Sequence, residues 1–181
     1  MKTGIFAAIC LLAGVTRAAE PVKVSSFGYS AEDATACFQK ALDSKEPLLL
    51  VDSQPGGWNV RPLVLRRGDL ELVFEPGVVV RAKKGAFVDG HDTLLSIEGG
   101  ATNVILRGGA GSGIAMNKQD YADRSRYAFS THRHALALRG CRNVTVKGLT
   151  ISMLAVTAYT CIVQSTRLSR TSRASARSAI R

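Results

Sequence analysis

Two stretches of the sequence repeat one pattern: Asn, Val, any residue, an aliphatic residue, a basic residue and Gly. They read NVILRGG from Asn103 and NVTVKGL from Asn143. In a stacked coil of parallel strands the same corner chemistry recurs, because each turn of the chain bends where the turn before it bent. Asn tolerates the left-handed conformation of such a corner, and its amide can bond to the neighbouring turn. The repeat therefore predicts a ladder of asparagines, with two unrelated turn residues as the alternative.

Short aliphatic runs follow one another from Leu48 onward, each too short for a helix. They begin at Leu48, Leu63, Leu70, Val78, Leu94, Val104, Leu136 and Val144. Gly, Pro, Asn and Asp separate them, and these residues bend a chain at low cost. The starts at Leu48, Leu70 and Leu94 lie about two dozen residues apart, which is the scale of solenoid repeats. An antiparallel sandwich would favour tight two-residue hairpins between the runs, so we predict an all-β fold of stacked parallel coils.

One amphipathic helix is predicted before the first strand. Ser30, followed by Ala31, Glu32 and Asp33, has the form of a capping box. Apolar residues then recur at helical spacing over roughly three turns, at Ala34, Cys37, Phe38, Ala41 and Leu42. An open end of a solenoid exposes apolar core and strand edges, so we expect this α-helix to cap the first coil.

The first 19 residues have the layout of a secretory signal. Lys2 gives a basic start, an apolar run extends from Ile5 to Val15, and small residues follow. The run is shorter than the roughly 18 apolar residues that span a bilayer, which disfavours the alternative of a membrane anchor. We therefore predict a signal peptide at 1–19, a secreted or periplasmic location, and no membrane association after cleavage.

The net charge of +10 is concentrated outside the predicted folded body. All 14 acidic residues lie between Glu20 and Ser152, whereas seven of the 24 basic residues lie in the signal or near the end of the chain. The body is thus close to neutral, and we expect no nucleic-acid partner for it. Binding of nucleic acid through the arginine-rich end would be steeply salt-dependent.

After Ile151 the alternation of strands and turns is lost, and no Asp, Glu or Gly occurs. We divide the chain into the signal, the N-terminal part of a β-coil domain at 20–152, and an irregular Ser/Arg-rich tail at 153–181. A change of reading frame near Met153 would explain the tail; a disordered basic segment is the alternative. Cys37, on the apolar face of the helix, and Cys141, in a turn, are expected to be buried thiols.

Three segments resemble the pectate lyase and polygalacturonase superfamily of right-handed parallel β-helix proteins. They are VSSFGYSAEDATACFQKALD, LVLRRGDLELVFEPGVVVRA and HRHALALRGCRNVTVKGLTIS, within residues 22–152. The resemblance implies a right-handed parallel β-helix and a polysaccharide partner, acidic or neutral. It transfers no catalytic residue, because neither the paired aspartates of the hydrolases nor the calcium-binding carboxylates of the lyases occur. Fold alone does not fix the reaction.

The candidate binding segment is the longest gap between strands, from Gly108 to Arg133, because long insertions on a solenoid often form its binding surface. Tyr121 can stack on a sugar ring, and Arg124, Arg126 and Arg133 can pair with uronate carboxylates. His134 completes the candidate set. The alternative is a solvated loop whose arginines bind local carbonyls.

His132 and His134 alternate on a predicted strand, a spacing that can bind a metal. No third ligand completes such a site, so neither a metal nor another cofactor is expected. We expect the N-terminal part of an exported β-helix protein related to polysaccharide-degrading enzymes, truncated before its active coils and inactive alone. The alternative is a non-catalytic carbohydrate-binding or surface-adhesion module.

Overall fold

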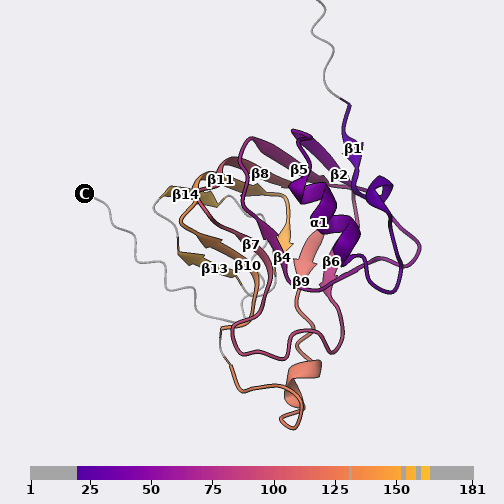
Figure 1. Cartoon of the computed structure of the whole chain (residues 1–181), viewed down its shortest axis with the longest axis vertical. Helices are drawn as coiled ribbons and strands as arrows, with labels where there is room; N and C mark the ends of the chain where they lie inside the picture. Colours follow the sequence, from indigo (N-terminus) through magenta and orange to yellow (C-terminus); the bar gives the residue numbers. More distant parts are fainter. Residues whose placement is uncertain (1–19, 131, 152–153, 158–159, 164–181) are drawn as a thin grey trace, which may run out of the picture.

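The computed structural model describes residues 20–130, 132–151, 154–157 and 160–163, and these form three parallel sheets of short strands (Figure 1). Sheet A contains β1 (Val22–Lys23), β2 (Leu48–Val51), β5 (Leu70–Phe74), β8 (Thr102–Gly108), β11 (Arg142–Lys147) and β14 (Thr160–Val163). Sheet B contains β3 (Trp58–Val60), β6 (Val79–Ala82), β9 (Gly113–Ala115) and β12 (Thr150–Ile151). Sheet C contains β4 (Leu63–Leu65), β7 (Thr93–Ile97), β10 (His134–Arg139) and β13 (Leu154–Thr157). The predicted signal at 1–19 and residues 164–181 lie outside the described residues.

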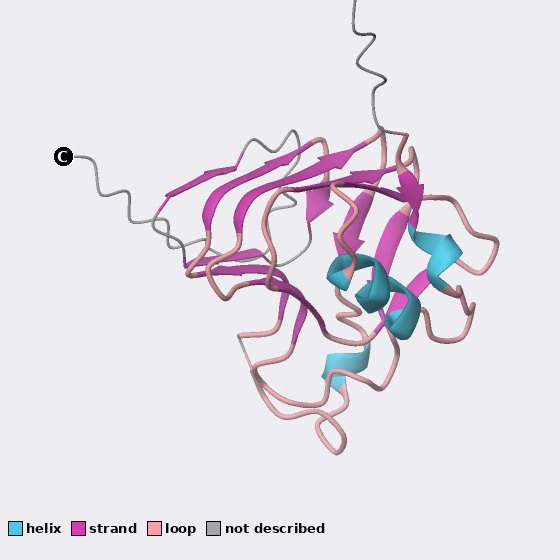
Figure 2. Cartoon of the chain, turned by 45° about the horizontal axis from the view of Figure 1, so that its top comes forward, coloured by secondary structure: helices cyan, strands magenta, loops and turns pink. Residues whose placement is uncertain are grey.

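From β2 onward the chain visits sheets A, B and C in strict rotation. Each strand therefore pairs in parallel with the strand that the chain laid down one rotation earlier, as β5 does on β2 and β8 does on β5. Figure 2 shows the strands of neighbouring rotations running side by side. This arrangement confirms the expected mostly-β fold with parallel sheets and is compatible with a parallel β-helix.

The predicted regular spacing of about two dozen residues holds only for the first rotation. Leu48 is opposite Glu71, but Leu70 is opposite Val104, and Val104 is opposite Val144. Leu94, counted as the third member of the series, lies in β7 of sheet C and does not stack on Leu70 at all. The spacing lengthens because the connections from sheet B to sheet C grow, while those at the other two corners stay short.

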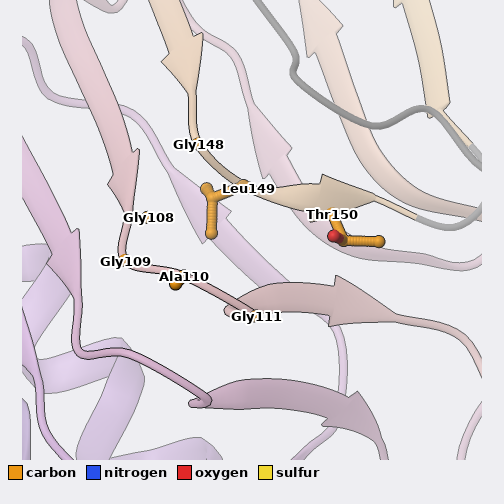
Figure 3. A pocket seen from close by; sticks show the side chains of 7 residues that line it. All are labelled: Gly108, Gly109, Ala110, Gly111, Gly148, Leu149 and Thr150. Carbon is orange, nitrogen blue, oxygen red and sulfur yellow. The ribbon is translucent and has the colours of Figure 1, made fainter.

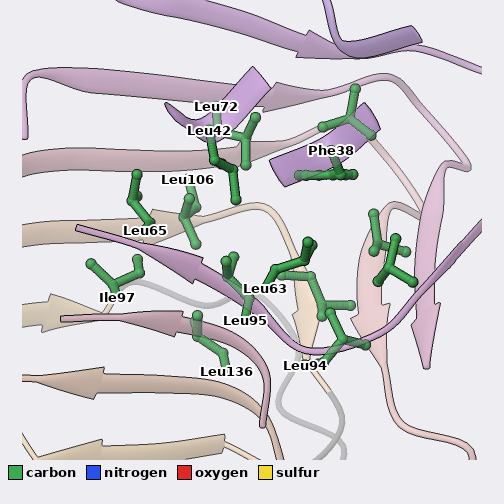
Figure 4. Close-up of a cluster of buried hydrophobic side chains, with 14 of the residues drawn as sticks. Phe38, Leu42, Leu63, Leu65, Leu72, Leu94, Leu95, Ile97, Leu106 and Leu136 are labelled. Carbon is green, nitrogen blue, oxygen red and sulfur yellow. The ribbon is translucent and has the colours of Figure 1, made fainter. Parts of the chain in front are cut away.

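The core lies inside the three sheets and consists of aliphatic and aromatic side chains, which alternate with outward-facing residues in strands such as those of sheet A. In β5, Leu70, Leu72 and Phe74 are buried, whereas Glu71 and Val73 are half-exposed. Figure 4 shows side chains from several strands meeting in one cluster, among them Leu63, Leu95 and Leu136 of neighbouring sheet C strands. This period-two burial is the pattern of strands that are buried on one face.

The asparagine ladder is present and has a third member. Asn103 and Asn143 both have positive φ, at 55° and 50°, and the Asn143 amide donates to Asn103 Oδ1 at 2.7 Å. Asn103 in turn donates to Asp69 Oδ1 at 2.9 Å, and Asp69 has a φ of 52°. The same corner thus uses the same conformation in three successive rotations, which confirms the prediction and adds Asp69 to it.

Asn103→Ala is expected to lower the free energy of unfolding by about 2 kcal/mol, because it removes both ladder hydrogen bonds and forces Ala into a left-handed conformation. Asn103→Gly relieves the conformational cost but not the lost bonds, and should lower it by about 1 kcal/mol. Urea unfolding of the two variants separates these contributions. Equal losses for both would show that left-handed strain does not matter at this corner.

The helix α1 (Thr35–Asp43) lies against β3 and β4, which are end strands of sheets B and C. A short 3-10 helix, η1 (Val24–Phe27), precedes it. The predicted apolar residues are buried, with Phe38 and Leu42 reaching into the core cluster (Figure 4). The helix therefore covers the first strands of the stack, as expected.

The predicted start of this helix at Ser30 is wrong, because α1 begins at Thr35. Asp33 supplies the acceptor at this end: its Oδ1 accepts bonds from the Thr35 amide, at 3.1 Å, and from the Thr35 hydroxyl. Arg61 and Lys83 hold the other oxygen at 2.9 and 3.0 Å. Partners distant in the sequence thus fix Asp33, which local motif reading could not detect.

Asp33 is expected to make stability depend on pH in the acid range. Burial alone would raise the pKa of Asp33, but hydrogen bonds from Thr35, Arg61 and Lys83 outweigh it and hold the pKa well below its usual range. The ionised form therefore stabilises the fold above about pH 4, and this contribution is lost as the pH falls further. Asp33→Asn should flatten the acid limb of the stability curve measured by urea unfolding from about pH 6 to pH 2. Asp43→Asn, at the far end of α1, is the matched control and should leave that limb steep.

Candidate functional site

The predicted gap from Gly108 to Arg133 is not free of strands, because it contains the last residue of β8 and all of β9. The rest of the candidate segment, residues 116–133, connects β9 to β10 and projects from the body of strands at the bottom of Figure 1. It contains the short 3-10 helix η2 (Asp120–Ala122). A second long connection, between β6 and β7, runs beside it: the Ala128 amide donates to Val88 O at 3.2 Å, and the Ser130 hydroxyl donates to Gly90 O. Two loops from successive rotations therefore form one layer at this corner.

Arg133 holds the two loops together. Its guanidinium donates to Phe87 O and Val88 O of the first loop, each at 3.0 Å, and to Ala128 O of the second at 2.8 Å. The residue is only 2% exposed. The sequence suggested Arg133 as a uronate ligand, with binding of local carbonyls as the alternative, and these three bonds are of the second kind.

Two tyrosine rings enclose the Arg133 guanidinium. Its carbon lies 4.7 Å from the centre of the Tyr121 ring and 5.9 Å from that of Tyr127, and the two rings meet edge to face at 5.4 Å. The Tyr121 hydroxyl is buried without a hydrogen-bond partner. Burial raises the pKa of Tyr121 to about 12, although the Arg133 charge opposes that rise. An unsatisfied buried hydroxyl is costly to the fold.

A pocket of about 310 Å³ opens beside these residues. It is lined by Lys118, Tyr121, Ala122, Arg124, Ser130 and Arg133. The lining includes three basic side chains and no carboxylate, so its field favours an anionic group. The structure thus brings together three of the five candidate residues, Tyr121, Arg124 and Arg133, in what we call the Tyr121 pocket.

Arg126 and His134 do not line the Tyr121 pocket. The Arg126 guanidinium lies over Gly85, where a Cβ would approach Arg126 Nη2 to 2.5 Å, and 5.9 Å from the Tyr127 ring centre. His134 is half-buried at the start of β10, opposite Thr93 of β7. Burial lowers the pKa of His134, and the nearby His132 and Arg139 lower it further, which favours a neutral imidazole.

Sequence reasoning missed three residues around the pocket: Lys118, Ser130 and Phe129. Phe129 is 75% exposed, and Arg124 lies over its ring with 4.6 Å between the guanidinium carbon and the ring centre. An exposed aromatic ring beside a cationic pocket is a stacking surface for a sugar. The signal for Phe129 was its place in a loop rich in charged residues.

A different hollow, of about 380 Å³, lies at the corner between sheets A and B (Figure 3). Glycines from two rotations line it, together with Ala110, Leu149 and Thr150. No ionisable side chain faces it, so it has little to offer a polar ligand.

His91 and His132 place their rings 5.4 Å apart, close to the two loops. Within the described residues, however, no group of three His, Cys, Asp or Glu side chains is placed to hold a metal ion. Cys37 and Cys141 are buried free thiols, as predicted, and burial raises the pKa of each.

No family model, no curated protein and no solved structure matches the chain. Among the described residues, no helix is long and apolar enough to cross a membrane. The candidate site therefore rests on its own geometry and chemistry.

Proposed function

We propose that the chain is part of an exported right-handed parallel β-helix protein related to the pectate lyase and polygalacturonase superfamily, and that the Tyr121 pocket binds an acidic sugar unit of a polysaccharide. The strict rotation through three parallel sheets and the corner ladder support the fold half of this proposal. The Tyr121 pocket supports the binding half.

The observation that carries the binding proposal is the composition of the pocket. Lys118 and Arg124 contribute exposed cations, Tyr121 contributes an aromatic side chain to the lining, and the exposed ring of Phe129 lies against Arg124. A uronate unit has matching groups: a carboxylate for the cations and an apolar ring face for the aromatic side chains. Arg133 holds the pocket in shape through the carbonyls that it binds.

A second candidate function is a non-catalytic carbohydrate-binding or surface-adhesion module. The absence of any carboxylate from the lining of the pocket favours it, because the paired Asp and Glu residues of glycoside hydrolysis have no counterpart there. Both candidates make the same use of the pocket, and they differ only in whether catalysis occurs elsewhere in the protein.

Binding of an oligogalacturonate to the purified protein, measured by titration calorimetry, tests the pocket. Arg124→Gln should weaken binding about tenfold because it removes a charge-assisted bond. Tyr121→Phe removes only a buried hydroxyl and should leave binding unchanged. Arg142→Gln, which removes an exposed cation on β11, is the matched control and should bind normally. A neutral oligosaccharide that binds as tightly as the oligogalacturonate, or an Arg124→Gln variant indistinguishable from the control, would refute an acidic-sugar site here.

A further inference from the structure

The outer face of sheet B carries a row of side chains in register across three rotations. Asn59 of β3 is opposite Arg81 of β6, and Arg81 is opposite Ala115 of β9. Trp58, Val60, Val80 and Ala82 point into the core from the same strands. Asn59 and Arg81 therefore face outward, and Arg81 stands between a short amide and a methyl group.

Arg81 differs from two outward-facing arginines at the other two sheets, Arg107 and Arg66. On sheet A, Arg107 bonds to Glu71 at 2.6 Å, and at the ends of the sheet C strands Arg66 bonds to Glu98 at 2.9 Å. These are the cross-strand charge pairs expected on a solvated sheet face. Arg81 has no carboxylate in either cross-strand position, and nearby Lys84 likewise has none within ion-pair distance among the described residues.

Hollows lie on both sides of Arg81. One, of about 220 Å³, lies over Ala115 and has Lys84, Asn117 and Met116 in its lining. The other, of about 180 Å³, lies toward Trp58 and the glycines at the sheet A corner. The small side chain of Ala115 leaves the first hollow open. Neither lining includes a carboxylate.

We propose that the hollow over Ala115 is a second binding site, which takes an oxyanion, a sulfate or a phosphate, held between Arg81 and Lys84. The Arg81 guanidinium offers a planar fork of donors and Lys84 a point charge, a combination suited to tetrahedral oxyanions. The Asn59 and Asn117 amides, at the edge of the hollow, can donate to further ligand oxygens. The site shares no lining residue with the Tyr121 pocket, and its occupancy does not depend on the function proposed for that pocket.

The oxyanion is either free in solution or an ester on a small organic molecule. Met116 and Ala115 give the hollow an apolar floor, which an organic group can cover and a bare ion cannot. Titration with inorganic sulfate, inorganic phosphate and glucose 6-phosphate therefore distinguishes the two sources. Tighter binding of the ester than of either inorganic ion assigns the site to an organic ligand, and equal binding assigns it to the ion alone.

The test uses the full chain and follows amide chemical shifts during these titrations. Arg81→Gln and Lys84→Gln should each weaken binding about tenfold, as expected for charge-assisted bonds. Ala115→Leu should abolish it by filling the hollow without a change of charge. Lys147→Gln removes an exposed cation on β11 of sheet A and should bind like the wild type. Unchanged thermal unfolding of the Arg81 and Lys84 variants shows that the fold is intact.

Three results would overturn the site. One is a shift pattern that does not saturate. Another is an equal loss of affinity in Lys147→Gln and Arg81→Gln, which marks diffuse attraction to net charge. The third is tight binding that survives Ala115→Leu in a folded protein. Arg124→Gln provides a separate check, because it alters the Tyr121 pocket and should leave oxyanion binding on sheet B unchanged.

Discussion

Replacing Arg133 with Met should lower the free energy of unfolding by about 3 kcal/mol or more, among the largest single-residue effects in the protein. Three hydrogen bonds would be lost, each at a cost of roughly 1 kcal/mol: Phe87 O and Ala128 O would have no donor among the described residues, and Val88 O would keep only the Ala128 amide. The contacts of the guanidinium with two tyrosine rings would add to the loss. Removal of a buried charge recovers some desolvation energy, but not enough to offset three lost hydrogen bonds, two of which leave an acceptor unsatisfied.

Urea unfolding measures this loss of stability, and two further variants serve as comparisons. Arg133→Lys keeps the charge but lacks the planar fork that reaches carbonyls on both loops, so it should recover less than half of the loss. Arg126→Met removes an exposed arginine from the same loop and should cost less than about 0.5 kcal/mol. If Arg126→Met proved as destabilising as Arg133→Met, the charge of the loop in general, and not the hydrogen bonds of the buried Arg133, would hold the two loops together.

The second large effect is expected at Gly148, at the corner between sheets A and B. Its φ is 69°, and a Cβ there would approach the Gly108 carbonyl oxygen to 2.5 Å. Figure 3 shows the Gly108 and Gly148 corners next to each other in successive rotations. Ala at 148 must therefore displace backbone in addition to adopting a left-handed conformation. We expect Gly148→Ala to destabilise the protein by about 3 kcal/mol, well above the 1–2 kcal/mol of left-handed strain alone.

Gly140 is a matched control in the same rotation. Its φ is 60°, but no atom lies within 4 Å of the position that a Cβ would take. Gly140→Ala should therefore show only the conformational cost, about 1 kcal/mol. Thermal unfolding of both variants separates left-handed strain from the contact between rotations. Equal destabilisation would mean that the stacked corners can move apart freely.

The architecture was largely predictable because the longer strands contain recognisable aliphatic runs. Each aliphatic run expected from the sequence lies within or overlaps a strand, and the Asn103–Asn143 repeat identified a genuine stacked corner. Strands β1, β3, β9 and β12 were missed, since two or three residues such as Gly113–Ala115 carry no periodicity. Pairing with a neighbouring rotation makes these segments strands, and single-sequence patterns do not contain that information.

No strand was expected beyond Ile151, yet β13 and β14 pair in parallel with β10 and β11. The sequence after Ile151 lacks the Gly and Asp residues that mark the turns between the earlier strands. The pattern that predicts those earlier strands is therefore absent here. The neighbouring edge of the sheet supplies backbone donors and acceptors whatever the side chains are.

The candidate site was predictable as a segment but not as chemistry. Length and polarity pointed to the loop that holds Tyr121 and Arg124, and these residues do line a pocket. The role of Arg133 depends on Phe87, a residue 46 positions earlier that only the fold brings near. Arg81 carried no signal in the sequence. Its lack of a carboxylate partner depends on which residues lie opposite it on the two neighbouring strands, and these are Asn59 and Ala115.

The unequal growth of the connections has a consequence for engineering. At the corner from sheet B to sheet C the chain runs from Ala82 to Thr93 in one rotation and from Ala115 to His134 in the next, while β7 and β10 still pair in register. The length of the connection at this one corner therefore does not affect the alignment of the strands, and the entropic cost of a longer loop grows only slowly. The surface between Ala122 and Ser125 should therefore accept a foreign peptide, a fluorophore tag or a whole inserted domain without loss of the fold, although an insertion there would disrupt the Tyr121 pocket, which Ala122 and Arg124 line.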